Sequence, residues 1–295
     1  MAPVNRQAPK IALIGATGTV GRLLAAALTT RAVAWRALVR DPPRARGLLG
    51  TAGELAAADL ARPETLPGAL EGVERLYLAT DVQPDTVALQ RAAIRAAREA
   101  GVRHVVKLSN LGADPRSDFL NARWHGESER ELEASGLAWT FLRPHYFMDN
   151  LLVYAPALKA GGELFGPAPA TRISPIDARD IAAVGAAALC EPGHEGCAYD
   201  LTGPAGVSFG EIAAGVSTAL GRPVRVVALP PAEMRRRLVA AGRPDWYAGT
   251  LALLYGMYEA GGWDAVSDAV ARVRGRPPIA FPQFLADHAR AFREA

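Results

Sequence analysis

Three glycines near the start of the chain have a spacing that favours phosphate binding. Gly15, Gly18 and Gly21 follow the short apolar run 11–14 and precede the apolar segment 23–28. Because glycine has no Cβ, it allows a sharp turn after a strand and a close approach of the backbone to a ligand. The free N–H groups at the start of the next helix would then face a negatively charged group. Strand, glycine turn and helix together predict the pyrophosphate-binding turn of a dinucleotide-binding fold.

A tight strand–helix turn that binds no ligand is the alternative interpretation of these glycines. If the turn does bind a dinucleotide, its backbone and short side chains contact the cofactor. The residues that we then expect at the cofactor are Gly15, Thr17, Gly18, Thr19, Val20 and Gly21.

A basic residue stands where dinucleotide-binding folds recognise the adenosine ribose. Folds that use NAD usually place an acid about 20 residues after the glycines, where it holds the 2′-hydroxyl. Here Arg40 stands nineteen residues after Gly21, at the end of the apolar run 33–39. A guanidinium attracts a 2′-phosphate, whereas a carboxylate repels it. We therefore expect NADP(H) as the cofactor, with NAD(H) less favoured and a solvated basic loop as the alternative.

Two further strand ends carry candidate cofactor contacts. Asp59 and Leu60 end the third predicted strand, and Ala79 and Thr80 end the fourth. Asp59 could accept a hydrogen bond from the adenine amino group while Leu60 packs on the ring, and a carboxylate that caps a helix or turn is the alternative. Ala79 and Thr80 would lie beside the cofactor ribose, because ligands of open α/β sheets gather at the carboxyl ends of the strands.

The elements that position these residues alternate without a break from residue 10 to residue 144. The predicted strands cover 11–14, 33–39, 54–60, 73–80, 104–108 and 138–142, and the predicted helices cover 23–28, 64–70, 85–100 and 121–135. This alternation predicts an α/β fold of the Rossmann type, with a doubly wound parallel sheet.

After Pro144 the pattern changes to an aromatic and apolar segment, a loop rich in glycine and proline, and several helices. Ser208 and Glu211 form a predicted capping box for a helix that ends at Leu220. We predict an NADP-binding domain over residues 1–150 and a smaller, mostly helical substrate-binding lobe over 151–295. Segments at about 172–190 are expected to return to the first domain.

The composition excludes several other classes of protein. Of the 295 residues, 50% are hydrophobic and 21% are charged, which is typical of a folded globular chain. The net charge of +3 is small and the arginines are dispersed, so we expect no nucleic-acid partner. The first ten residues lack the apolar core of a signal peptide, and no run is long enough to span a membrane. We therefore expect a cytoplasmic protein with no membrane partner.

The two cysteines, Cys190 and Cys197, are expected to be free thiols in a reducing compartment. Together with His194 they do not have the spacing of metal ligands, so we expect no metal site.

Several longer segments resemble one protein family. They are IALIGATGTVGR (11–22), ALVRDPPRA (37–45), AADL (57–60), VVKLSNLGA (105–113), RWHGESERELEASGLAWTFLRP (123–144), HYFMDNLL (145–152) and PIDARDIAAV (175–184). The chain resembles the NmrA-like group of atypical short-chain dehydrogenases/reductases over nearly its whole length. The resemblance implies a Rossmann fold and NAD(P)H binding. Members of the group include NADPH-dependent quinone and azo reductases, a redox-sensing regulator that binds the dinucleotide without turnover, and reductases of plant phenylpropanoids.

The chain departs from the short-chain dehydrogenase pattern where that pattern carries its proton donor. Typical members have a serine after the fifth strand and, about a dozen residues later, Tyr-x-x-x-Lys, whose tyrosine donates the proton. Ser109 fits the serine, but Asn121 stands at the tyrosine position and His125 at the lysine position. The helical i, i+4 spacing is kept. Because an amide cannot donate a catalytic proton, the usual ketoreductase mechanism is not supported.

His125 is the first candidate for the missing function. Its ordinary pKa near 6.5 would let it gain or lose a proton at working pH. The resemblance implies that the residue at this position, like Ser109, lies near the nicotinamide ribose, so we expect His125 to be a ribose contact and a general acid. A histidine on the helix surface that pairs with Glu129 is the alternative.

Tyr146 is the second candidate. The resemblance places the loop after the sixth strand beside the nicotinamide, so Pro144, Tyr146 and Phe147 are expected cofactor contacts. The Tyr146 phenol could donate a proton, and a core-filling aromatic is the alternative. Lys107 stands in an otherwise apolar strand, and we expect its stem to pack while its tip reaches the surface.

The leading hypothesis is an NADPH-dependent oxidoreductase that transfers hydride to a flat, electron-poor small molecule, quinone-like or aromatic. Such an acceptor needs little proton assistance, which suits a site without the tyrosine. An aromatic pocket would be lined by the loop 145–169 and by Trp246, Tyr247, Tyr255, Met257, Tyr258 and Trp263. The alternatives are a non-catalytic NADP(H)-sensing regulatory protein and a secondary-metabolite tailoring reductase for an imine or enone. An oligomer is compatible with the sequence.

Overall fold

The computed structural model describes residues 10–294, so the signal-peptide prediction concerns residues that lie almost entirely outside the described range. The chain divides into two compact units. The first unit runs to Pro144 and resumes over Ala178–Asp200. The second unit holds His145–Asp177 and the chain from Leu201 onward. Assignment of cofactor binding to residues 1–150 and of substrate binding to 151–295 stays a prediction.

The first unit is built on a seven-stranded sheet with the order β3-β2-β1-β4-β5-β6-β9. Strands β1 to β6 pair in parallel wherever they are neighbours. This order reverses direction between β1 and β4, as in doubly wound dinucleotide-binding sheets. The predicted Rossmann-type fold is therefore confirmed. The strands are β1 (Ile11–Ile14), β2 (Trp35–Val39), β3 (Glu54–Ala57), β4 (Arg75–Leu78), β5 (His104–Leu108), β6 (Ala138–Pro144) and β9 (Cys197–Leu201).

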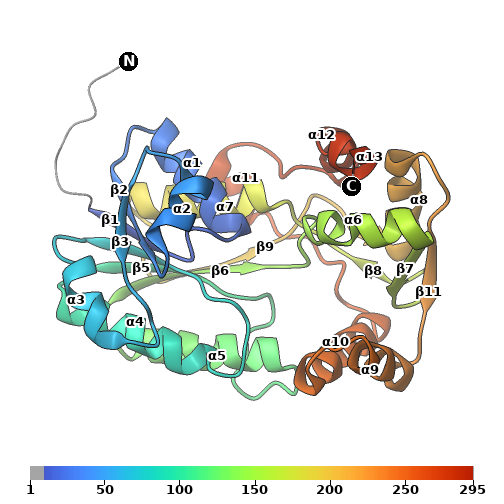
Figure 1. Cartoon of the computed structure of the whole chain (residues 1–295), viewed down its shortest axis with the longest axis horizontal. Helices are drawn as coiled ribbons and strands as arrows, with labels where there is room; N and C mark the ends of the chain where they lie inside the picture. The colour runs from blue at the N-terminus through green and yellow to red at the C-terminus, as the bar shows by residue number, and fades with distance from the viewer. Residues whose placement is uncertain (1–9, 295) are drawn as a thin grey trace. The chain divides into compact units, whose positions relative to one another are not determined.

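Helices cover both faces of this sheet (Figure 1). Helices α1 and α7 pack against each other on one face, and α4 and α5 pack against each other on the other face. Strand β1 (IALI) is accordingly apolar throughout, and β4 (RLYL) is apolar after Arg75, as expected for a parallel sheet without a solvent-facing side. The helices of this unit are α1 (Thr19–Thr30), α2 (Pro42–Leu49), α3 (Leu66–Ala69), α4 (Thr86–Glu99), α5 (Leu120–Glu133) and α7 (Ala178–Cys190), with a 3₁₀ turn at Pro63–Thr65.

The second unit contains most of the remaining helices and two small sheets. Strands β7 (Glu163–Gly166) and β11 (Arg225–Ala228) pair in parallel, and β8 (Arg172–Ile173) and β10 (Val207–Ser208) pair antiparallel. The helices are α6 (Asn150–Gly161), α8 (Phe209–Leu220), α9 (Pro231–Ala240), α10 (Asp245–Glu259), α11 (Ala269–Arg274), α12 (Phe281–Asp287) and α13 (Ala289–Glu294).

The predicted capping box at the start of α8 is confirmed. The Glu211 backbone N–H donates to Ser208 Oγ at 3.1 Å, and the Ser208 backbone N–H donates to Glu211 Oε2 at 2.7 Å. Across residues 10–294, no helix is both long enough and apolar enough to cross a membrane.

Candidate functional site

The glycine turn between β1 and α1 depends on two close backbone approaches. Gly15 adopts a φ of +82°, and a Cβ there would lie 2.5 Å from the carbonyl oxygen of Ala79. A Cβ at Gly21 would lie only 2.1 Å from the carbonyl oxygen of Gly15. Both positions therefore require glycine, and the turn fits tightly against the residue that follows β4. The expected cofactor contacts Ala79 and Thr80 thus lie beside this turn.

The N-terminus of α1 is open to solvent. Gly18 is the N-cap residue, no side chain caps the helix, and its first turn carries no acidic residue. Thr17, Gly18 and Thr19 are exposed. Because the first N–H groups of a helix have no partner within it, this end attracts an anion. The open end of α1 supports the prediction that residues 17–21 hold the cofactor phosphates, and this role stays a prediction.

Arg40 is exposed at the turn between β2 and α2, and it forms no ion pair with any residue of the described chain. Its neighbour Asp41 is occupied, since the Asp41 carboxylate accepts a hydrogen bond from the Arg44 backbone N–H at 3.0 Å and so caps α2. The Arg40 guanidinium is therefore available to an external anion.

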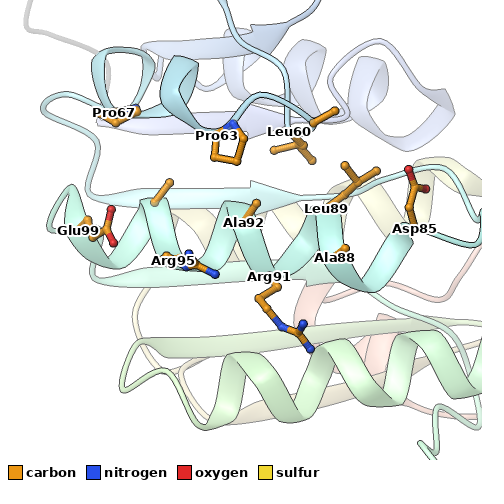
Figure 2. Close-up of a pocket in the computed structure, with 12 residues that line it drawn as sticks. Leu60, Pro63, Pro67, Asp85, Ala88, Leu89, Arg91, Ala92, Arg95 and Glu99 are labelled. Atoms are coloured by element: carbon orange, nitrogen blue, oxygen red, sulfur yellow. The ribbon is translucent and has the colours of Figure 1, made fainter.

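Asp59 and Leu60 differ in what they can offer a ligand. The Asp59 carboxylate accepts hydrogen bonds from the Ala61 backbone N–H at 3.1 Å and from Arg62 Nε at 3.3 Å, so it stabilises its own turn. Leu60 lines a pocket of about 480 Å³ between the segment 60–67 and α4. Figure 2 shows Leu60 from the loop and Leu89 from α4 at the same end of this pocket, near Asp85. An apolar wall of this kind suits a flat ring, which supports the predicted role of Leu60 more than that of Asp59.

The side chain of Lys107 is fully buried, so the expectation that its tip reaches the surface is wrong. Lys107 Nζ donates to the carbonyl oxygen of Leu108 at 3.3 Å and to His125 Nδ1 at 3.0 Å. His125 lies on α5 and is only 7% exposed. The alternative of a surface histidine paired with Glu129 is therefore also wrong.

Glu129 instead binds Ser109, which directly follows β5, and Arg143 of β6. Ser109 Oγ donates to Glu129 Oε1 at 2.5 Å, and Arg143 donates from Nε at 3.0 Å and from Nη2 at 2.5 Å. Ser109 and Glu129 are both buried. The Ser109 hydroxyl is thus held by a carboxylate that a bidentate guanidinium neutralises.

Burial changes which of these groups titrates near neutral pH. Burial lowers the pKa of Lys107 from 10.5 to about 7. Burial and the neighbouring Lys107 charge hold the pKa of His125 well below its ordinary value. The His125 ring is therefore neutral at neutral pH, which does not support its predicted titration there. With Nδ1 accepting from Lys107, the proton of His125 is on Nε2, which is a hydrogen-bond donor. Its contact with the cofactor ribose stays a prediction.

The remaining predicted residues are Pro144, where the first unit gives way to the second along the chain, and Tyr146 and Phe147 just after it. Pro144 ends β6, and its carbonyl oxygen accepts a hydrogen bond from the Leu111 backbone N–H at 3.0 Å. Tyr146 and Phe147 belong to the second unit, where burial raises the pKa of Tyr146 well above its ordinary range. The proposed roles of Tyr146 and Phe147 at the nicotinamide stay predictions. The described residues include no group of three or more histidine, cysteine or acidic side chains able to hold a metal ion.

Comparison with known proteins identifies relatives along the whole chain. The sequence pattern of the NAD(P)H-binding family matches residues 15–192. The NAD(P)H azoreductase of Xenophilus azovorans is 42% identical over 285 residues, which are 97% of this chain and 100% of that protein. A (4-alkanoyl-5-oxo-2,5-dihydrofuran-3-yl)methyl phosphate reductase of Streptomyces griseus is 36% identical over 96% of this chain and 99% of its own length.

Solved structures agree with these matches. The crystal structure of the NADPH-dependent quinone oxidoreductase QOR2 from Escherichia coli, complexed with NADPH, superposes with a TM-score of 0.84 and 30% identity. The match covers 94% of this chain and 99% of QOR2. A mutant NmrA structure has a TM-score of 0.76 at 19% identity, which indicates a common fold.

The close approach at Gly21 predicts a selective loss of stability. Gly21→Ala should lower the free energy of unfolding by about 1–3 kcal/mol, because the added methyl group meets backbone rather than a flexible side chain. Gly47→Ala in α2 is the matched control, since no atom lies within 4 Å of its added Cβ. We expect the control to be neutral or more stable by up to about 1 kcal/mol. Urea unfolding of both variants measures this, and equal losses would contradict the packing argument.

The buried Lys107 predicts a pH-dependent stability. Its pKa is lower in the folded state, so the unfolded chain binds more protons between pH 7 and 10.5, and this group's contribution to stability is lost as pH falls through that window. Lys107→Met removes the cost of burying a charged ammonium, so the free energy of unfolding of the variant should exceed that of the wild type by most at pH 7. This difference in unfolding free energy should narrow by at most about 1.4 kcal/mol per pH unit towards pH 10.

Urea unfolding at pH 7 and pH 9.5 measures this gap. Lys159→Met, at a half-buried lysine of α6 whose ammonium binds the Arg293 carbonyl oxygen, is the control. If the difference in unfolding free energy between Lys107→Met and the wild type does not change with pH, the lowered pKa of Lys107 is contradicted.

Proposed function

Because this chain belongs to the NAD(P)H-binding family and to its NmrA-like, atypical short-chain dehydrogenase/reductase group, we propose that it is an NADPH-dependent oxidoreductase whose hydride acceptor is a flat, electron-poor molecule, quinone-like or aromatic. The single observation that supports dinucleotide binding in this proposal is the uncapped N-terminus of α1, which follows the turn at Gly15. Azoreductase and quinone oxidoreductase relatives, matched along most of the chain, support the acceptor half.

The choice of NADPH over NADH rests on Arg40. Its exposed guanidinium has no carboxylate partner among residues 10–294 and follows β2, where the fold presents the ribose 2′ position. A 2′-phosphate would supply the missing anion. Leu60 and Leu89 provide an apolar surface for the adenine ring in the same unit.

The chemistry requires little from the protein beyond position. NADPH, when bound, supplies the hydride, and an electron-poor ring delocalises the charge that arrives. Lys107 holds His125 as a neutral ring with its N–H on Nε2, so His125 can donate a hydrogen bond without being charged. The Arg143–Glu129–Ser109 cluster fixes the end of β5 beside this pair. None of these groups replaces the absent tyrosine as a strong proton donor, and a quinone does not need one.

Two specific observations favour two other functions, a regulatory protein and a tailoring reductase. The Ser109 hydroxyl is committed to Glu129 rather than free, which favours a protein that binds NADP(H) as a regulatory signal without turnover. The dihydrofuran phosphate reductase relative favours a tailoring reductase for an enone.

An NADPH oxidation assay separates these functions. Purified protein is mixed with NADPH and a panel of quinones, azo dyes and enones, and the absorbance of the reduced nicotinamide is followed. We expect turnover with quinones or azo dyes. Turnover with enones alone would favour the tailoring reductase. Micromolar NADPH binding without turnover of any acceptor would refute the enzyme and favour the regulatory protein.

Reversal of the charge at Arg40 tests the cofactor preference. Arg40→Asp should raise the Kd for NADPH by about 10–100-fold more than the Kd for NADH, because a charge-assisted hydrogen bond is replaced by repulsion. Arg98→Asp makes the same charge change in the last turn of α4 and should leave both constants within about twofold. Titration calorimetry gives the four values, and an equal loss for the two cofactors in Arg40→Asp would refute the 2′-phosphate assignment.

A further inference from the structure

A buried histidine in the second unit has an N–H group without an acceptor. His145 is 6% exposed, and its Nδ1 accepts a hydrogen bond from the Tyr146 backbone N–H at 2.6 Å. In the neutral ring the proton is then on Nε2. Among residues 10–294, Nε2 has no hydrogen-bond partner. Burial also lowers the pKa of His145 to about 4, so the ring stays neutral and Nε2 stays a donor at neutral pH.

A second unpaired polar atom lies on the neighbouring segment. Phe147 and Ile176 pair as a parallel bridge, in which the Ile176 backbone N–H donates to the Tyr146 carbonyl oxygen at 2.8 Å. Two residues earlier along these paired segments come His145 and Ser174. Ser174 is fully buried, and its Oγ has no hydrogen-bond partner in the described chain.

Trp263 contacts both residues that carry the unpaired atoms. Its carbonyl oxygen accepts a hydrogen bond from the Ser174 backbone N–H at 3.1 Å, and its ring meets the His145 ring edge-on, with centroids 5.8 Å apart. Tyr258 stacks on His145 at 5.7 Å with an interplanar angle of 19°, and it also contacts Trp263. The His145 ring is thus in contact with two aromatic side chains from the pocket wall that the sequence predicts, and Ser174 is bonded through its backbone to one of these two residues.

Such an arrangement is unusual in a packed interior. Buried polar groups in native proteins almost always have a partner, because a buried donor that lost its water and gained nothing costs free energy. A ligand atom with a lone pair is the natural partner here, and flat aromatic molecules are the natural neighbours of Tyr258 and Trp263. Trp263 is only half-buried, so its side chain is the one that an incoming ring can displace.

We propose that His145 Nε2–H and Ser174 Oγ–H bind the accepting oxygen of the substrate, with Tyr258 and Trp263 as the walls around its ring. This inference rests on the proposed function and names the part of the second unit that selects carbonyl-bearing acceptors. Hydride transfer from NADPH to a quinone gives NADP⁺ and a hydroquinone monoanion, which takes one proton from water. Two fixed neutral donors stabilise the oxygen on which that negative charge collects.

The test compares an acceptor that has such an oxygen with one that lacks it. His145→Phe keeps a flat ring for Tyr258 and removes the N–H, and Ser174→Ala removes the hydroxyl with little change in volume. His288→Phe is the matched control, since His288 also packs against an aromatic ring, Phe284, in the same unit. The acceptors are a 1,4-naphthoquinone and a triarylmethyl cation without oxygen, and thermal melting checks that each variant folds.

We expect His145→Phe to lower kcat/KM for the quinone by about 10–100-fold and to leave that for the cation within about twofold. Ser174→Ala should show the same selectivity with a smaller loss, and His288→Phe should change neither. The Kd for NADPH should not change in any variant. Equal losses for both acceptors, or no loss for the quinone, would overturn the inference.

Titration calorimetry measures the Kd of the quinone, so it tests the roles of His145 and Ser174 even if the protein does not reduce the quinone. The Kd of the quinone should rise about tenfold or more in His145→Phe. If the wild type binds the quinone but does not reduce it, the proposed function fails, while the rise in Kd still decides the inference. If the wild type does not bind the quinone, or if both proteins bind it equally, the two unpaired atoms hold water and the inference fails.

Discussion

The cofactor half of this protein depends on one constraint, the approach of backbone to backbone at Gly15 and Gly21. No side chain fits at either position, because carbonyl oxygens of Ala79 and Gly15 occupy the space. This contact seats the start of α1 over the edge where β1 and β4 end, which is the point at which the strand order reverses. The parallel pairing then carries Arg40 and Thr80 to the same edge. The backbone alone therefore shapes the predicted cofactor site before any side chain contributes.

The features that were predictable from the sequence depend on neighbours within a few residues. The glycine spacing, the alternation of strands and helices, and the capping box of Ser208 and Glu211 are local patterns, and the structure confirms all of them. Arg40 was chosen in the same way, by its distance from Gly21 along the chain, and its role at the cofactor stays a prediction. Local geometry decides such features, so the sequence contains them directly.

The buried polar pairs could not be predicted in this way. Lys107 and His125 are 18 residues apart, and Arg143 and Glu129 are 14 apart, on elements whose pairing only the tertiary fold decides. Lys107 was misjudged because a lysine near a surface extends its tip to water. Its strand β5 is central, with Leu78 beside it on β4 and Phe141 on β6, and α5 covers the face toward which it points. No route to water is left, so the ammonium binds a ring nitrogen instead.

The candidate site residues of the two units differ in how their buried polar groups are satisfied. We propose that this difference separates the functions of the two units. In the first unit, Lys107 binds His125 and Ser109 binds Glu129, so each of these polar groups has a partner within the unit. We expect such a preformed arrangement to hold the cofactor in one geometry. In the second unit, His145 and Ser174 each keep a polar atom without a partner among the described residues. These two donors gain a hydrogen bond only when a bound molecule supplies an atom with a lone pair. We therefore propose that selectivity for the acceptor belongs to side chains of the second unit, and that the glycine turn positions the cofactor.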